Sequence, residues 1–224
     1  MNVALPTLSL NDRVAEQIRD RIVRGEFQPG SRLSEVALSE SLEISRNTLR
    51  EVFRLLTKEG LLRHLPNRGV FVAIPSMASI MDIYRVRRMI ECQALQQAIP
   101  QHPARKEMRE AVAAQKQLRE AGRWVEVGTG NMRFHKGVVA LADSERLNTL
   151  FSHLLVELRL AFGMLGDAEF MHAPYIDLNA NILERFEAGD MEQAAKLMHD
   201  YLTHSERVLL SVYARRMSDA GMVL

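Results

Sequence analysis

Three arginines recur four residues apart, at Arg46, Arg50 and Arg54, and Asn47 and Thr48 lie beside the first of them. In a helix this spacing puts the arginines on one face. The other face would be apolar, with Leu49, Val52, Phe53 and Leu56. Arginine can donate two hydrogen bonds to guanine, and asparagine can pair with adenine, so this helix would suit the major groove of DNA. The alternative is an ordinary surface helix whose charges face water.

The segments before this helix predict a helix-turn-helix. Apolar spacing indicates a helix over residues 9–24, and Pro29 and Gly30 then mark a turn. A second helix over residues 34–42 is followed by Ser45, whose hydroxyl can cap the arginine-bearing helix. Two helices joined by a short turn, the second with a polar outward face, form a DNA-binding helix-turn-helix.

A β-hairpin is predicted after the arginine-bearing helix. Residues 61–65 and 70–73 have the composition of short strands, and a Pro-Asn-Arg-Gly turn lies between them. Arg68 at the tip would reach a phosphate or the minor groove, and Gly69 would allow close approach of the backbone. A helix-turn-helix followed by a hairpin is a winged helix, which we assign to residues 1–74.

The composition is that of a globular protein with no excess of basic residues. The chain has 224 residues, of which 47% are apolar, and a net charge of +1. DNA binding would therefore depend on the local placement of charge. Cys92 is the single cysteine, so no intramolecular disulfide forms and a reducing, cytoplasmic location is expected. The first ten residues lack a signal-peptide pattern, and no apolar run reaches the roughly 20 residues that span a bilayer, so no membrane partner is expected.

The remainder of the chain predicts helices only. Residues 75–77 form a short linker, because Pro75 disfavours helix in the residue before it and Ser76 can cap a helix that starts after it. Six amphipathic helices are then expected, over residues 78–99, 104–120, 124–141, 144–165, 174–188 and 190–216. The predicted fold class is mainly α, with a winged helix-turn-helix of three helices and a β-hairpin followed by an all-α six-helix bundle over residues 78–224.

Four polar side chains lie on the apolar faces of three of these helices. They are Asn131, His135, Asn179 and Tyr201. The functional interpretation is a polar ring that hydrogen-bonds an organic ligand. The alternative is a set of buried polar groups that satisfy each other or water. We favour the pocket, because four inward polar groups are more than a core usually carries.

Arg87 and Glu91 lie on or beside the inward stripe of the first helix of the bundle. They are four residues apart and could pair with each other. A partly buried arginine is also a natural anchor for a carboxylate or phosphate, because its guanidinium donates twice in one plane. The residues alone leave these two interpretations open.

The front part of the chain resembles the N-terminal domain of GntR-family bacterial transcription regulators over residues 9–74. The matching residues are Gly25, Pro29, Gly30, Leu33, Ser34, Glu35, Leu38, Ser45, Arg46, Leu49, Arg50, Glu51, Leu55, Glu59, Gly60, Leu61, Arg68, Gly69, Val70, Phe71 and Val72. The resemblance implies that the Ser45 helix is the recognition helix and the hairpin is the wing. The residues then expected to contact DNA are Arg32, Ser45, Arg46, Asn47, Thr48, Arg50, Asn67, Arg68 and Gly69.

The bundle resembles the FCD ligand-binding domain of the FadR branch of that family. The matching residues are Asp82, Ile83, Tyr84, Arg85, Val86, Arg87, Ile90, Glu91, Phe134, His135, Ile182, Leu183, Glu184, Glu187, Ala188, Gly189, Asp190, Ala194, Ala195 and Met198. Six helices instead of seven are typical of the VanR-like subgroup.

This resemblance also implies where a metal would lie. Many FCD domains hold a divalent metal with one Asp and three His, and Asn131, His135, Asn179 and Tyr201 occupy those positions here. Only His135 keeps its identity. Amides are poor ligands for zinc-type metals, and tyrosine must lose its proton first, so no tightly bound metal is expected. The same four residues and Arg87 are the expected effector-binding residues, and a small organic acid is the expected ligand.

These features predict a transcription regulator, expected to be a repressor, whose binding to a palindromic double-stranded operator responds to the small molecule. A homodimer is expected, because a palindromic site mirrors a two-fold axis and because the helix over residues 144–165 is very apolar. One alternative is a regulator with a non-functional effector pocket. The other, an enzyme built on the bundle, is disfavoured because the sequence has no nucleophile–base pair, carboxylate pair or glycine-rich phosphate loop.

Overall fold

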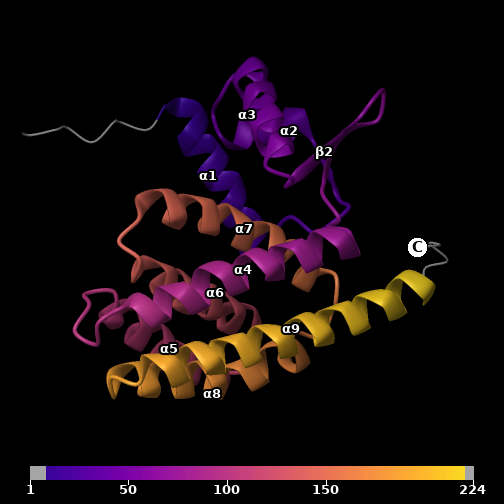
Figure 1. Cartoon of the computed structure of the whole chain (residues 1–224). Coiled ribbons are helices and arrows are strands. Elements are labelled where there is room, and N and C mark those ends of the chain that lie inside the picture. The colour runs from indigo at the N-terminus through magenta and orange to yellow at the C-terminus, as the bar shows by residue number, and fades with distance from the viewer. Residues whose placement is uncertain (1–8, 220–224) are drawn as a thin grey trace, which may run out of the picture. The chain divides into compact units, whose positions relative to one another are not determined.

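The computed structural model describes residues 9–219, and the chain divides into two compact units between residues 74 and 75 (Figure 1). The predicted fold class is confirmed, because the described part is mainly helical and a small sheet occurs only in the first unit. No helix within residues 9–219 is both long and apolar enough to cross a bilayer.

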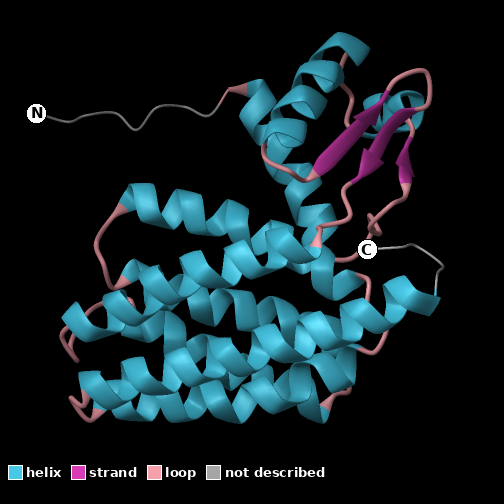
Figure 2. Cartoon of the chain, turned by 45° about the vertical axis from the view of Figure 1, so that its right-hand side comes forward, coloured by secondary structure: helices cyan, strands magenta, loops and turns pink. Residues whose placement is uncertain are grey.

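Within residues 9–74 the first unit contains three helices and a three-stranded antiparallel sheet (Figure 2). The helices are α1 Leu10–Val23, α2 Glu35–Ser41 and α3 Arg46–Lys58. The strands are β1 Arg32–Leu33, β2 Leu62–Leu65 and β3 Gly69–Val72, in the order β1-β3-β2. The expected β-hairpin is present, but the prediction lacked β1, because a strand of two residues leaves no periodic pattern in the sequence.

Serine caps set where these helices begin. Ser9 forms a capping box with Asp12, and Ser34 and Ser45 each accept a backbone N–H in the first turn of α2 and α3. The core of the unit is made by Ile18, Leu49, Val52, Leu56 and Leu61, each fully buried. Burial of this apolar face of α3 against α1 leaves the arginine-bearing face outward.

The second unit is the expected bundle of six helices. They are α4 Met77–Gln97, α5 Arg105–Glu120, α6 Trp124–Ala140, α7 Glu145–Gly163, α8 Ala168–Glu187 and α9 Met191–Asp219. Met77 already belongs to α4, since Ser76 caps that helix by accepting the N–H of Ser79. The expected linker over residues 75–77 is therefore one residue too long, because its last residue is helical.

The start of α8 differs most from the prediction. The sequence indicated a helix over residues 174–188, with a proline at its start, but α8 begins at Ala168. Asp167 caps it by accepting the N–H of Phe170 at 2.9 Å. Pro174 therefore lies inside the helix, where its ring lacks the N–H of a regular turn. The expected start was wrong because proline is usually found in the first turn of a helix.

Helix α6 is central to the bundle, where it packs against α4, α5, α7 and α8. Its glycines let these neighbours come close. A Cβ atom added to Gly137 would lie 2.8 Å from Cγ of Met108 on α5, and one added to Gly130 would lie 2.9 Å from Cγ of Gln115. Fully buried side chains such as Phe134, Phe151 and Phe186 fill the surrounding core. This packing carries His135, next to Phe134 in sequence, into the interior.

Candidate functional site

The N-terminal end of α3 carries three exposed polar side chains, Arg46, Asn47 and Arg50. Ser45 and Thr48 hold each other: the N–H of Thr48 donates to Oγ of Ser45 at 3.0 Å, and the two hydroxyls lie 2.9 Å apart. These two residues therefore fix how the helix begins. The geometry offers three flexible donors on a capped, rigid helix end, as base recognition requires.

Arg50 has an acidic partner that no local sequence pattern indicates. Its Nε donates to Oε2 of Glu35 on α2 at 3.0 Å, while 60% of the Arg50 side chain stays exposed. Arg54, one turn further along α3, pairs with Glu51 at 2.5 Å. The spacing of fifteen residues between Glu35 and Arg50 has no helical meaning, so only the fold brings them together.

The wing places the remaining expected DNA contacts at one end of the sheet. The N–H of Arg68 donates to the carbonyl of Leu65 at 3.0 Å, which closes the turn. Asn67 and Gly69 take positive φ angles of 60° and 103°, a conformation that asparagine and glycine tolerate. Arg32, on β1, lies beside Gly69: a Cβ atom added to Gly69 would lie 3.2 Å from Nε of Arg32. The structure thus brings the Arg32 guanidinium beside the residue that follows the turn of the wing.

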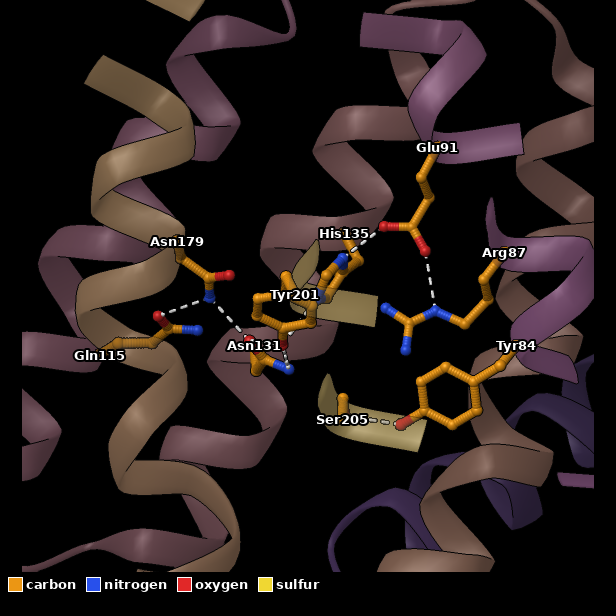
Figure 3. A network of polar contacts seen from close by, with 9 residues as sticks. All are labelled: Tyr84, Arg87, Glu91, Gln115, Asn131, His135, Asn179, Tyr201 and Ser205. Carbon is orange, nitrogen blue, oxygen red and sulfur yellow. Dashed lines mark hydrogen bonds and ion pairs between the residues drawn. The ribbon is translucent and has the colours of Figure 1, made fainter. Parts of the chain in front are cut away.

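In the second unit, a polar network runs through the core (Figure 3). Nε of Arg87 donates to Oε1 of Glu91 at 2.7 Å, and Oε2 of Glu91 lies 2.5 Å from Nδ1 of His135. Nε2 of His135 lies 3.0 Å from the hydroxyl of Tyr201. All four side chains are almost completely buried. Helices α4, α6 and α9 are thus joined by one line of polar contacts.

The network continues from Tyr201 through three amides. The amide of Asn131 lies within hydrogen-bond distance of the Tyr201 hydroxyl, at 3.0 Å from Nδ2. Asn179 donates its Nδ2 to Asn131 at 2.6 Å and to Gln115 at 3.1 Å. All five residues expected to bind the effector therefore belong to one network. Gln115 was not predicted to belong to this group, and its fully buried position on α5 follows from the close packing at Gly130.

Burial and neighbouring charges set the protonation of this network. Burial raises the pKa of Glu91, but Arg87 and His135 together lower it by more, so the net shift of this pKa is downward. Burial lowers the pKa of His135 despite the adjacent carboxylate. Burial raises the pKa of Tyr201 well above its usual range. At neutral pH the carboxylate of Glu91 is charged, His135 is neutral, and Tyr201 keeps its proton.

These states give every contact a direction. Neutral His135 donates from Nδ1 to Glu91, so its Nε2 accepts from the hydroxyl of Tyr201. The Tyr201 oxygen then accepts from Asn131, whose own oxygen accepts from Asn179. Apart from the second donation of Asn179, to Gln115, the protons point toward Glu91, where Arg87 supplies the balancing charge. Arg87 is therefore already paired, as one of the two interpretations of the sequence required.

A small cavity of about 20 Å³ lies beside the network. Its lining residues are Arg87, Gly128, Asn131, Met132, His135, Leu155, Leu158, Arg159, Phe162, His172, Tyr201 and Ser205. This volume holds about one water molecule. Nη2 of Arg87 is buried and has no hydrogen-bond partner among the described residues. Asn179 does not line the cavity and contacts it only through Asn131.

The donor set does not fit a transition metal. Within residues 9–219, no group of three or more His, Cys, Asp or Glu side chains is placed to hold one. His135 and Glu91 could each contribute one donor, but they bind each other, and the second nitrogen of His135 lies against Tyr201. The remaining neighbours are amides and a protonated phenol, which are weak ligands for zinc-type metals.

The first unit is a winged helix with exposed arginines on α3, the second helix of its helix-turn-helix. The second unit is a helical bundle with a buried polar cavity. Together these features define a DNA-binding regulator of two domains. The chain belongs to the GntR family of bacterial regulatory proteins. Residues 10–72 match the family described as "Bacterial regulatory proteins, gntR family", and residues 82–204 match the FCD domain. The resemblance stated from the sequence is confirmed at this level.

Known proteins of the same kind resemble the chain along most of its length. A solved structure of a putative GntR transcriptional regulator from Rhodococcus sp. RHA1 is 35% identical, covers 91% of this chain and 99% of that chain, and superposes with a TM-score of 0.86. The HTH-type regulator YdhC of Bacillus subtilis is 29% identical over 62% of this chain and 63% of its own length, so the chain spans less than two thirds of that relative.

A third relative is the probable D-xylose utilization operon transcriptional repressor of Paenarthrobacter nicotinovorans. It is 28% identical over 81% of this chain and 82% of its own length. The families and relatives are transcription regulators and not enzymes, so the chain is a transcription regulator of the GntR family with an FCD domain.

Proposed function

We propose that this regulator is a cytoplasmic repressor that binds a palindromic operator as a homodimer and responds to a small anionic metabolite. A relative described as a probable repressor supports the sign of regulation. The six helices of the bundle support its assignment to the VanR-like subgroup of the FadR branch. The observation that carries the proposal is the exposed polar end of α3 beside a wing whose tip is Arg68.

In this proposal Arg46, Asn47 and Arg50 read base edges in the major groove. Arg68 and Asn67, together with Arg32 and Gly69, approach the backbone or the minor groove through the wing. Ser45 and Thr48 hold the start of α3, where a phosphate would also meet the helix N-terminus.

Selection of bound DNA from a random pool tests this function. The expected result is an enriched inverted repeat with half-sites about one helical turn apart, bound more tightly than scrambled DNA at the same salt concentration. Enrichment of no sequence, with binding that depends on salt alone, would contradict the operator-binding proposal.

The homodimer is proposed from the surface of α7. Leu150 is 53% exposed, and Leu147 and Leu154, on the same stripe of α7, are only half-buried. An apolar surface of this kind is usually covered in the assembled protein. Light scattering should give the mass of a dimer, and Leu150→Glu should lower it. The control is Phe170→Glu, which changes another exposed apolar residue on α8.

The effector site is proposed at the buried cavity, with Arg87, Asn131, His135 and Tyr201 lining it and Asn179 behind them. A cavity that holds about one water must open to admit a metabolite, and this coupling of binding to helix movement would let the ligand alter DNA binding. The alternative is a closed pocket that binds nothing, because its polar groups largely satisfy each other. Analysis of small molecules that co-purify with the protein from its own cytosol distinguishes the two.

A further inference from the structure

A second basic side chain lines the cavity, and it does not belong to the residues that the sequence predicted to bind the effector. Arg159 of α7 lines it together with Arg87 of α4. Among the described residues that line the cavity, none is acidic. Glu91, which pairs with Arg87, lies outside this lining. The lining therefore carries two guanidinium groups whose N–H groups can donate to the oxygens of an anion, while Glu91 already balances the charge of Arg87.

The position of Arg159 is fixed by its neighbours. Its Nη2 donates to the carbonyl of Val125 at 3.0 Å, and its Nη1 lies 3.3 Å from Nε2 of His172. The ring of His172 in turn packs against Phe162, with centroids 5.4 Å apart. Burial and the adjacent Arg159 lower the pKa of His172 to about 3. The histidine is thus a neutral acceptor that holds the guanidinium.

Gly128 of α6 leaves the space that the side chains of Arg159 and His172 occupy. A Cβ atom at this position of α6 would lie 2.4 Å from Nη1 of Arg159 and 2.5 Å from Nε2 of His172. Both distances are far below a normal contact, so any larger residue would displace the pair. The glycine therefore sets where the Arg159 guanidinium lies in the wall of the cavity.

The rest of the lining has a polar part, made of Asn131, His135, Tyr201 and Ser205, and an apolar wall, made of Met132, Leu155, Leu158 and Phe162. Such a wall suits the hydrocarbon part of a ligand and disfavours a second charged group. We propose that Arg159, positioned by Gly128 and His172, binds the single carboxylate of an effector whose body is apolar, and that the unpartnered Nη2 of Arg87 is its second donor. This inference rests on the proposed function, because it names the ligand class of the proposed effector site.

Thermal unfolding with matched acids and amides tests the proposal. The probes are acetate, butyrate and benzoate beside acetamide, butyramide and benzamide, which have the same shapes without the charge. At least one acid should raise the unfolding temperature of the wild-type protein saturably, and its amide should not. In Arg159→Gln the acid concentration for half of the full shift should rise about tenfold, as expected for one lost charge-assisted hydrogen bond.

Three further variants sharpen the test. Arg159→Lys should keep part of the response, because it keeps the charge, and Gly128→Ala should lose it by displacing Arg159. The matched control is Arg133→Gln, which removes an exposed arginine of the same unit that pairs with Glu107 and Glu110. Circular dichroism at 25 °C shows whether each variant is folded.

The proposal is overturned if no acid stabilises the protein, if acids and amides act alike, or if Arg159→Gln responds as the wild type does. Binding of the selected operator is measured on the same samples without ligand. Operator binding that persists in Arg159→Gln while the acid response is lost supports the inference. Absence of specific DNA binding in the wild type would instead contradict the proposed function, whatever the acids do.

Discussion

Nε of Arg50 donates to Oε2 of Glu35 at 3.0 Å, which joins the exposed face of α3 to the helix before it. Only 33% of the Glu35 side chain is exposed, against 60% of the Arg50 side chain, so the carboxylate lies deeper in the surface than the arginine. One edge of the guanidinium is thus engaged before any DNA is bound. This contact orients the side chain that we expect to read a base.

Arg50→Ala should weaken binding to the selected operator by about 1–3 kcal/mol, the usual value for a bidentate contact to guanine. It should also reduce discrimination at one base-pair position of each half-site. Fluorescence anisotropy with the operator and single-base variants measures both effects. Unchanged specific binding by a folded Arg50→Ala protein would remove this residue from the reading face.

Glu35→Gln should weaken discrimination without weakening total affinity. The variant removes a negative charge near the DNA and releases Arg50 from its fixed orientation, so binding to non-cognate DNA should rise relative to the operator. Glu51→Gln is the matched control, because it removes a similar charge from a pair that involves Arg54. If both variants change discrimination equally, charge alone is responsible and Glu35 has no orienting role.

Glu91→Gln should destabilise the second unit by about 3 kcal/mol or more, because it leaves the buried Arg87 without its counter-charge. Chemical denaturation measures the change in the free energy of unfolding. Glu107→Gln breaks the exposed pair with Arg133 and should cost less than about 1 kcal/mol. Equal losses in the two variants would mean that the buried pair has no special importance for stability.

The pKa of His172 predicts how stability depends on pH. In the folded protein it is lowered to about 3, against about 6.5 in an unfolded chain. The unfolded state therefore binds the proton first, and stability that is complete above about pH 6.5 is lost as the pH falls toward 3. In His172→Phe the unfolding free energy should fall less steeply between pH 6.5 and pH 4. Parallel slopes in the wild type and in His172→Phe would contradict the assignment.

The protein should contain no stoichiometric transition metal. Both nitrogens of His135 already have protein partners, and the other positions of the expected metal site are Asn131, Asn179 and Tyr201. Elemental analysis after purification without a histidine tag and after dialysis measures this directly. Zinc, nickel or manganese at one equivalent that disappears in His135→Ala would show that the site had been rebuilt from other ligands.

The sequence by itself determined most of the elements and the direction of many side chains. Helical spacing and serine caps are local properties, so α3, its apolar face and its exposed arginines could be read directly from residues 45–58. The same reasoning placed Asn131, His135, Asn179 and Tyr201 on inward faces, because a side chain's direction on a helix follows from its position in the turn. The local signal at Pro174 was misleading, because a proline can lie in the first turn of a helix, as predicted, or inside it, as in α8.

Only the tertiary structure decided which of these inward groups meet. Arg87 could equally have paired with Glu91 or anchored a ligand. In the structure it pairs with Glu91 on the same helix, the packing of α4 on α6 brings that carboxylate to His135, and Nη2 of Arg87 has no partner among the described residues. Arg159 drew no attention in the sequence, because its role depends on the room that Gly128 leaves on another helix. Such contacts join residues far apart in the chain and depend on how closely and at what rotation two helices pack, which no local pattern specifies.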